Sequence, residues 1–114
     1  ILFPDLRWKR CDIKSVNLLG NVLASQAARE AGAAEAVLYR EDGLVTEASH
    51  SSFFAVKDGV IRTSPSSNAI LPGITRGFLS RLIESVGLRL EQRALHRDEL
   101  SSCSELFLTG TSLE

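Results

Sequence analysis

Residues 53–63 read FFAVKDGVIRT. Two short apolar runs rich in β-formers flank the pair Asp58-Gly59, which is a strong local signal for a tight antiparallel hairpin. Outward from this hairpin, the same patterns predict further strands and two amphipathic helices. The strands are expected at residues 35–40, 44–46, 88–94 and 105–108, a short helical turn at 97–101, and the helices at 18–32 and 74–86. Because strands outnumber helices and the hairpin is antiparallel, we expect an α+β fold rather than a doubly wound parallel sheet.

Length and charge restrict the possible functions. The 114 residues are 44% hydrophobic, which predicts one globular unit. Thirteen basic and 14 acidic residues are mixed along the chain and give a net charge of −1. Without a polybasic stripe or a long apolar run, we expect neither a nucleic-acid nor a membrane partner. Cys11 and Cys103 have no metal-ligand partners nearby, so we expect free thiols, no metal site and a cytoplasmic protein.

One lysine stands in an unusual context. Residues 7–19 read RWKRCDIKSVNLL, with Lys14 between Ile13 and the mostly apolar residues 16–19. Such a neighbourhood favours the neutral amine, the form that attacks an aldehyde. A single lysine is usually a solvated charge, so Lys14 alone does not establish a function.

Two further stretches add a carboxylate and an anion site. Residues 46–54 read TEASHSSFF and place Glu47 at the end of a strand. Residues 71–76 read LPGITR and open a helix, where the amides of Ile74 and Thr75 can bind a phosphate. A surface glutamate and a plain helix cap are the ordinary interpretations. Together with Lys14, however, these groups are what a pyridoxal 5'-phosphate (PLP) site needs.

The three stretches, in this order, resemble the class IV (fold-type IV) aminotransferases, most of all their D-amino-acid transaminase branch. The resemblance runs from Arg7 to Glu114. It implies a mixed or antiparallel sheet, or a barrel-like core, with helices packed outside. Residues 1–114 would be the large C-terminal domain, incomplete at both ends and without the small N-terminal domain. It also implies a homodimer acting on an amino acid and a 2-oxo acid.

The resemblance implies a role for individual residues. Lys14 would form the Schiff base with PLP and move a proton to and from the substrate α-carbon. Glu47 would face the ring nitrogen. The phosphate would be held by three residues: Ile74, Thr75 and Thr111.

Other positions have two possible interpretations. Leu71 would pack on the ring face or serve as an ordinary core residue. Arg7 would face the polar edge of the cofactor or lie at the surface. Ser112 would lie at the substrate rim, and His50 would touch substrate or be solvated.

The chain departs from the family pattern at Ala48, where the family has Gly, and at Ser52, where it has Asn. These changes affect loop geometry and substrate class rather than Glu47. A branched-chain aminotransferase, an R-selective amine transaminase, an aminodeoxychorismate lyase and a non-catalytic PLP-binding module therefore remain alternatives.

Overall fold

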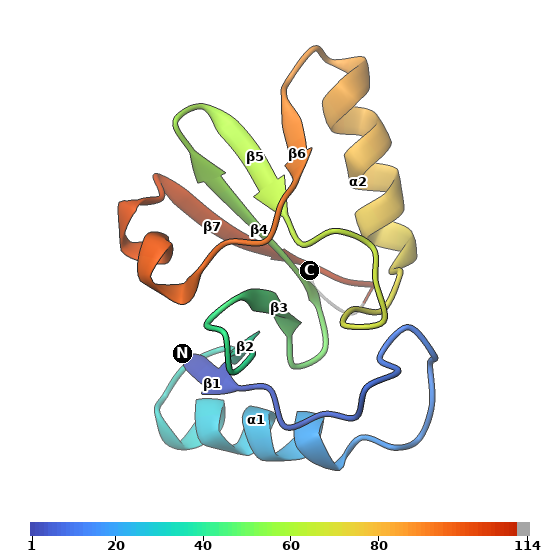
Figure 1. The fold of residues 1–114 in the computed structure, drawn as a ribbon, viewed down its shortest axis with the longest axis vertical. Helices are drawn as coiled ribbons and strands as arrows, with labels where there is room; N and C mark the ends of the chain where they lie inside the picture. The colour runs from blue at the N-terminus through green and yellow to red at the C-terminus, as the bar shows by residue number, and fades with distance from the viewer. Residues whose placement is uncertain (112–114) are drawn as a thin grey trace.

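The computed structural model describes residues 1–111 (Figure 1). In chain order these residues form seven strands, two α-helices and one 3-10 helix. They are β1 (Leu2–Pro4), α1 (Leu19–Glu30), β2 (Val37–Tyr39), β3 (Val45–Ala48), β4 (Ser52–Lys57), β5 (Val60–Thr63), α2 (Ile74–Ser85), β6 (Leu90–Gln92), η1 (Arg97–Ser102) and β7 (Glu105–Thr109). The predicted α+β class is confirmed, and β1 is the one strand of this set that the sequence patterns did not predict.

The strands form two mixed sheets. The first has the order β1-β2-β3 and the second the order β6-β5-β4-β7. The pairs β1–β2 and β5–β6 are parallel, and the other pairs are antiparallel. The hairpin β4–β5 turns at Asp58 and Gly59, both with positive φ (53° and 75°), as a tight hairpin turn requires. The chain crosses from the first sheet to the second through residues 49–51, directly after β3, the strand that carries Glu47.

Helix α1 packs against the first sheet through small residues. Ala24 and Ala28 are buried against Ala36 and Leu38. The larger residues at the predicted helical spacing are exposed: Leu19, Val22 and Leu23. The periodicity thus predicted the helix but not its buried face. Alanine side chains let the helix approach the sheet closely, which leaves the leucines on the outside.

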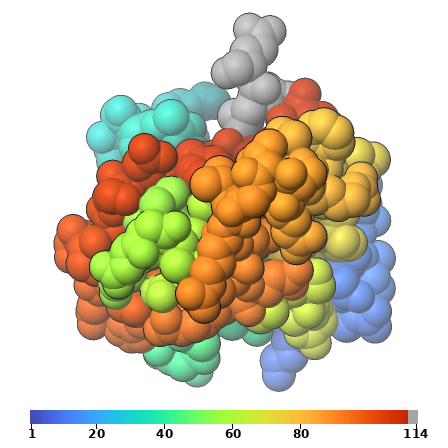
Figure 2. All heavy atoms as spheres, turned by 90° about the horizontal axis from the view of Figure 1, so that it is seen from above, coloured from blue at the N-terminus to red at the C-terminus, as the bar shows by residue number. Residues whose placement is uncertain are grey.

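Helix α2 lies along the second sheet (Figure 1) and shows the same feature. Ile83 is buried, whereas Phe78, Leu82 and Val86 are exposed. Figure 2 shows the C-terminal end of α2 and the following residues, in orange, at the surface beside the β4–β5 turn. Single exposed apolar residues are normal, but two apolar helix faces on one small unit are unusual.

Cys11 and Cys103 are free thiols, as predicted. Within residues 1–111, no helix is long and apolar enough to cross a lipid bilayer.

Candidate functional site

A pocket of about 640 Å³ opens between four segments of the chain. This volume is typical of small-molecule sites. Its walls come from residues before α1, from the β3–β4 connection, from the start of α2 and from the end of β7. Seven residues singled out from the sequence line it: Arg7, Lys14, Glu47, Leu71, Ile74, Thr75 and Thr111. Ser112 lies outside the described residues.

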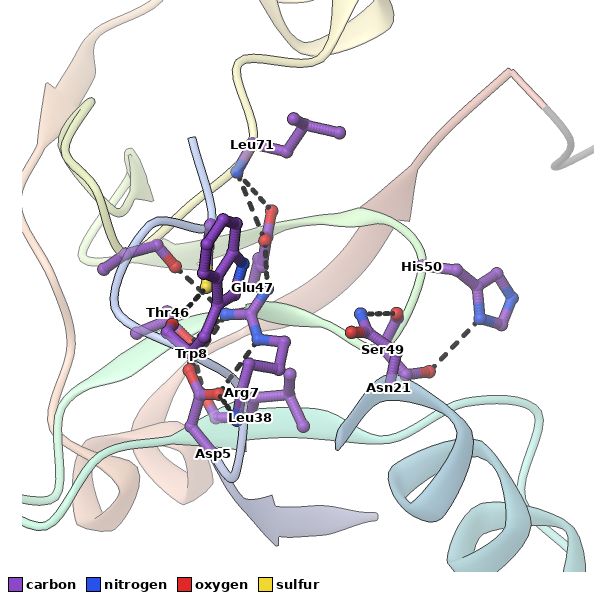
Figure 3. A network of polar contacts seen from close by, with 12 residues as sticks. Asp5, Arg7, Trp8, Asn21, Leu38, Thr46, Glu47, Ser49, His50 and Leu71 are labelled. Carbon is purple, nitrogen blue, oxygen red and sulfur yellow. Dashed lines mark hydrogen bonds and ion pairs between the residues drawn. The ribbon is translucent and has the colours of Figure 1, made fainter. Parts of the chain in front are cut away.

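Strand β3 delivers Glu47 to the floor of this pocket, where it is buried. Arg7 Nη1 donates a hydrogen bond to Glu47 Oε1. The Leu71 N–H donates to both carboxylate oxygens at 3.2 Å (Figure 3). The carboxylate is therefore fixed from two directions by segments distant in sequence.

Arg7 is held as firmly as Glu47. Its Nε and Nη2 donate to the two oxygens of Asp5, each at 2.9 Å, and Nη2 also donates to Ala69 O at 3.0 Å. The side chain is only 5% exposed. Arg7 lines the pocket, but its hydrogen bonds within the described residues go to protein groups, Glu47 among them. A contact with the cofactor's polar edge stays a prediction.

The two carboxyls that share Arg7 differ in pKa. Burial raises the pKa of Glu47, and the opposing effects of Arg7 and the Leu71 N–H are weaker. Burial also acts to raise the pKa of Asp5, but the hydrogen bonds and charge of Arg7 outweigh it, so the pKa falls below its ordinary value. Burial would lower the pKa of Arg7, yet Asp5 and Glu47 raise it overall. Arg7 thus stabilises the charged form of Asp5 more than that of Glu47, through two parallel hydrogen bonds to Asp5.

Lys14 lies in an irregular segment before α1 and is exposed. Within residues 1–111 it makes no hydrogen bond or ion pair that would occupy its amine. The apolar side chains expected to enclose it do not do so: Val16 is 98% exposed, and Ile13 and Leu18 are also exposed. These neighbours therefore do not bury Lys14, although Ile13 and Leu18 line the same pocket as its side chain.

The start of α2 offers unoccupied hydrogen-bond donors. Gly73 is its N-cap in an extended conformation, and no side chain caps the helix. The first-turn amides, including those of Ile74 and Thr75, have no intrahelical acceptors. In the same pocket, the buried Thr109 hydroxyl has no partner within the described residues. Amides at a helix N-terminus and a free hydroxyl are donors that a phosphate group accepts, so the residues present fit the phosphate of PLP.

The sequence patterns missed Asp5, although it anchors Arg7. No motif marks it, because its importance arises from the sheet order β1-β2-β3, in which Asp5, directly after β1, reaches Thr46 of β3 and accepts a hydrogen bond from its hydroxyl at 3.0 Å. They also missed Asn21 of α1, whose Nδ2 donates to Ser49 O at 2.6 Å on the pocket wall.

Comparison with known proteins identifies relatives along the full chain. Over all 114 residues the chain is 50% identical to the D-alanine aminotransferase of Bacillus licheniformis and 44% identical to that of Staphylococcus aureus strain N315. It spans about 40% of the length of each of these proteins.

Solved structures show the same fold. The branched-chain aminotransferase of Thermoproteus uzoniensis has a TM-score of 0.86 and 30% identity, with 96% of this chain and 39% of that chain covered. The T.th. branched-chain amino acid aminotransferase with pyridoxamine 5'-phosphate has a TM-score of 0.85 and 34% identity, with 97% and 38% covered. The family model described as "Amino-transferase class IV" matches residues 3–114. With its order of motifs, its mixed sheets and this match, the chain belongs to the class IV aminotransferase family.

Proposed function

We propose that this chain is the cofactor-binding part of a PLP-dependent transaminase. The enzyme would move an amino group between D-alanine, or a related D-amino acid, and a 2-oxo acid. The observation that carries the proposal is one pocket that brings together Lys14, Glu47 and the start of α2 from three separate segments. The 44–50% identity to D-alanine aminotransferases supports the choice of substrate.

PLP, when bound, supplies an aldehyde that captures amines and a ring that withdraws electrons. The exposed Lys14 amine would bond the cofactor and would take and return a proton at the substrate α-carbon. The buried Glu47 carboxylate would keep the ring nitrogen protonated. Arg7 and the Leu71 N–H keep that carboxylate in place, so it needs no reorganisation during the reaction.

The remaining pocket residues bind and orient. The amides of Ile74 and Thr75, with the hydroxyls of Thr75, Thr109 and Thr111, would hold the phosphate. Leu71 gives its N–H to Glu47, and its side chain on the pocket wall would pack on the ring.

A branched-chain aminotransferase is the second candidate, because enzymes of that activity are among the structural neighbours. Their identities of 30% and 34% are lower than those of the D-alanine enzymes. The substrate therefore separates the two candidates, and the shared fold does not.

We also propose that residues 1–114 are most of the large domain of a longer cytoplasmic protein, with a small domain elsewhere and a second identical subunit. The apolar outer faces of α1 and α2 support this, because a stable protein normally covers such faces. Light scattering on the complete protein tests the dimer. A monomeric mass at micromolar concentration would contradict it.

Turnover by the complete, PLP-loaded protein tests the function. Four amino donors are supplied one at a time with 2-oxoglutarate: D-alanine, L-leucine, R-phenylethylamine and aminodeoxychorismate. We expect D-alanine to give the highest kcat/KM. Preference for L-leucine would support the branched-chain alternative instead. Stable PLP binding with no turnover of any donor would indicate a non-catalytic module.

A further inference from the structure

Glu35, between α1 and β2, is a buried carboxylate that has no part in the proposed chemistry. Its side chain is 3% exposed. Three donors from residues 49–51 converge on it: Ser49 Oγ at 3.2 Å, the His50 N–H at 2.7 Å and Ser51 Oγ at 2.6 Å. The whole turn between β3 and β4 is thus bonded to one side chain.

This turn satisfies the buried oxygens of Glu35. Within residues 1–111 no lysine or arginine pairs with it, and the only ion-pair partner is His50, with Nδ1 3.4 Å from Oε1. A buried carboxylate without a cation is stable only while its hydrogen-bond donors stay in place. Glu35 and residues 49–51 therefore fix one another.

The same turn forms a wall of the pocket. Residues 49–51, which begin two positions after Glu47, line it, and Asn21 Nδ2 of α1 donates a hydrogen bond to Ser49 O. The His50 side chain lies at this wall and is 53% exposed (Figure 3). The unoccupied donors at the start of α2 line the same pocket from a different element. If α2 held the phosphate and Glu47 the ring nitrogen of PLP, the exposed His50 side chain would remain available to contact the incoming amino acid.

We propose that Glu35 is a positioning residue for substrate binding: it holds residues 49–51 so that the His50 wall contacts the amino acid. The inference rests on the proposed transaminase function. Glu35 does not touch cofactor or substrate. Its effect passes through the turn, so it should alter KM for the amino donor much more than cofactor affinity.

Glu35→Gln tests this in the complete PLP-loaded protein. An amide keeps the size of the carboxylate but loses the charge and one acceptor oxygen, so the two donors to the remaining oxygen are bound more weakly and the group at the NH2 position can no longer donate there. We expect KM for D-alanine to rise by about tenfold or more, because small displacements of a binding group weaken substrate positioning strongly. The Kd for PLP and kcat should change less than about threefold.

Thr63→Val is the matched control, because it removes a buried hydrogen bond to Phe53 O (2.8 Å) away from the pocket. It should lower the melting temperature comparably and leave KM unchanged. Ser51→Ala, which removes the shortest bond to Glu35, provides a second route if Glu35→Gln fails to fold. It should also raise KM, and the double variant should be less than additive.

The outcomes separate the two proposals. No turnover by the unaltered protein would refute the transaminase and, with it, the substrate role of Glu35. Turnover with the same KM in the unaltered protein and in a folded Glu35 or Ser51 variant would refute the Glu35 role alone. An equal rise in KM for Thr63→Val would show that the KM effect of Glu35 comes from lower overall stability rather than from the position of the turn, and would refute the proposal.

Discussion

Lys14 and Glu47 line one pocket but are built in opposite ways. Lys14 is exposed in an irregular segment, and its amine has no partner within residues 1–111. Glu47 is buried on a strand and receives hydrogen bonds from Arg7 and Leu71, with Arg7 held in turn by Asp5. The difference fits two tasks. A nucleophile must be accessible and free to change partners, whereas a charge that stabilises a reacting ligand works best when it is fixed beforehand.

Loss of the amine should have the largest effect on activity and almost none on folding. We expect Lys14→Ala to lower kcat by about 10³-fold or more, because it removes both the nucleophile and the proton carrier. The free energy of unfolding should stay within about 0.5 kcal/mol, as for other exposed positions. Lys9→Ala, at an exposed lysine five positions earlier, is the control and should retain activity. A Lys14→Ala enzyme with normal kcat would show that Lys14 is neither the nucleophile nor the proton carrier.

Loss of the fixed charge should affect activity much more than folding. We expect Glu47→Gln to lower kcat by about 10²–10³-fold, as when a preorganised electrostatic group is removed. Its effect on the free energy of unfolding at neutral pH should be small, because burial, which raises the pKa of Glu47, already disfavours the charge that the amide removes. Steady-state kinetics and urea unfolding measure the two effects. Near-normal kcat would show that Glu47 is not the electrostatic group described here.

A smaller effect is expected at the start of α2. Thr75→Ala removes one hydroxyl but leaves the backbone donors, so PLP affinity should fall by about 1–3 kcal/mol, or roughly five- to 150-fold in Kd. Chemistry in the PLP-saturated enzyme should slow less than this. Equilibrium dialysis against PLP gives the Kd. A large fall in kcat at saturation with unchanged affinity would move Thr75 from phosphate binding to catalysis.

The smallest expected effect is on the pH dependence of stability, through Asp5 and Glu47, the two carboxyls that Arg7 contacts. The pKa of Glu47 is raised above its ordinary value of 4.5, so the stability linked to its proton is present at low pH and is lost as the pH rises through the folded pKa. The pKa of Asp5 is lowered below 3.8, so its stabilising effect is present at higher pH and is lost as the pH falls through the folded pKa. Carboxyl ¹³C NMR should show Glu47 protonating before Asp5 as the pH falls. The reverse order would mean that Arg7 stabilises the charged form of Glu47 more than that of Asp5.

Local patterns predicted most of this fold. The Asp58-Gly59 turn, both helices and the strand that carries Glu47 lie within about two residues of where the sequence places them. Such features depend on neighbours in sequence. The buried face of α1 could not be predicted in this way, because hydrophobic spacing favours its leucines while packing against β2 selects its alanines.

The site residues were identified by motif, but their connections were not. Nothing in the sequence near Asp5 or Glu35 indicates that one anchors Arg7 and the other anchors the turn after β3. Both connections join positions brought together by strand pairing and by the crossing between sheets. The exposure of the apolar side chains around Lys14 was equally unpredictable, because apolar residues in an irregular segment have no period that assigns them a side.

Chemical trapping of the cofactor tests directly whether Lys14 is the residue that bonds PLP. The complete protein is loaded with PLP, reduced with borohydride and digested, and the modified peptide is identified by mass spectrometry. This chain contains three lysines, Lys9, Lys14 and Lys57, so the other two act as internal controls. We expect a stoichiometric pyridoxyl group on Lys14 in the unaltered protein and no pyridoxyl group at this position in Lys14→Ala. Modification of Lys9 or Lys57 instead, or no modification of a PLP-saturated protein, would contradict it.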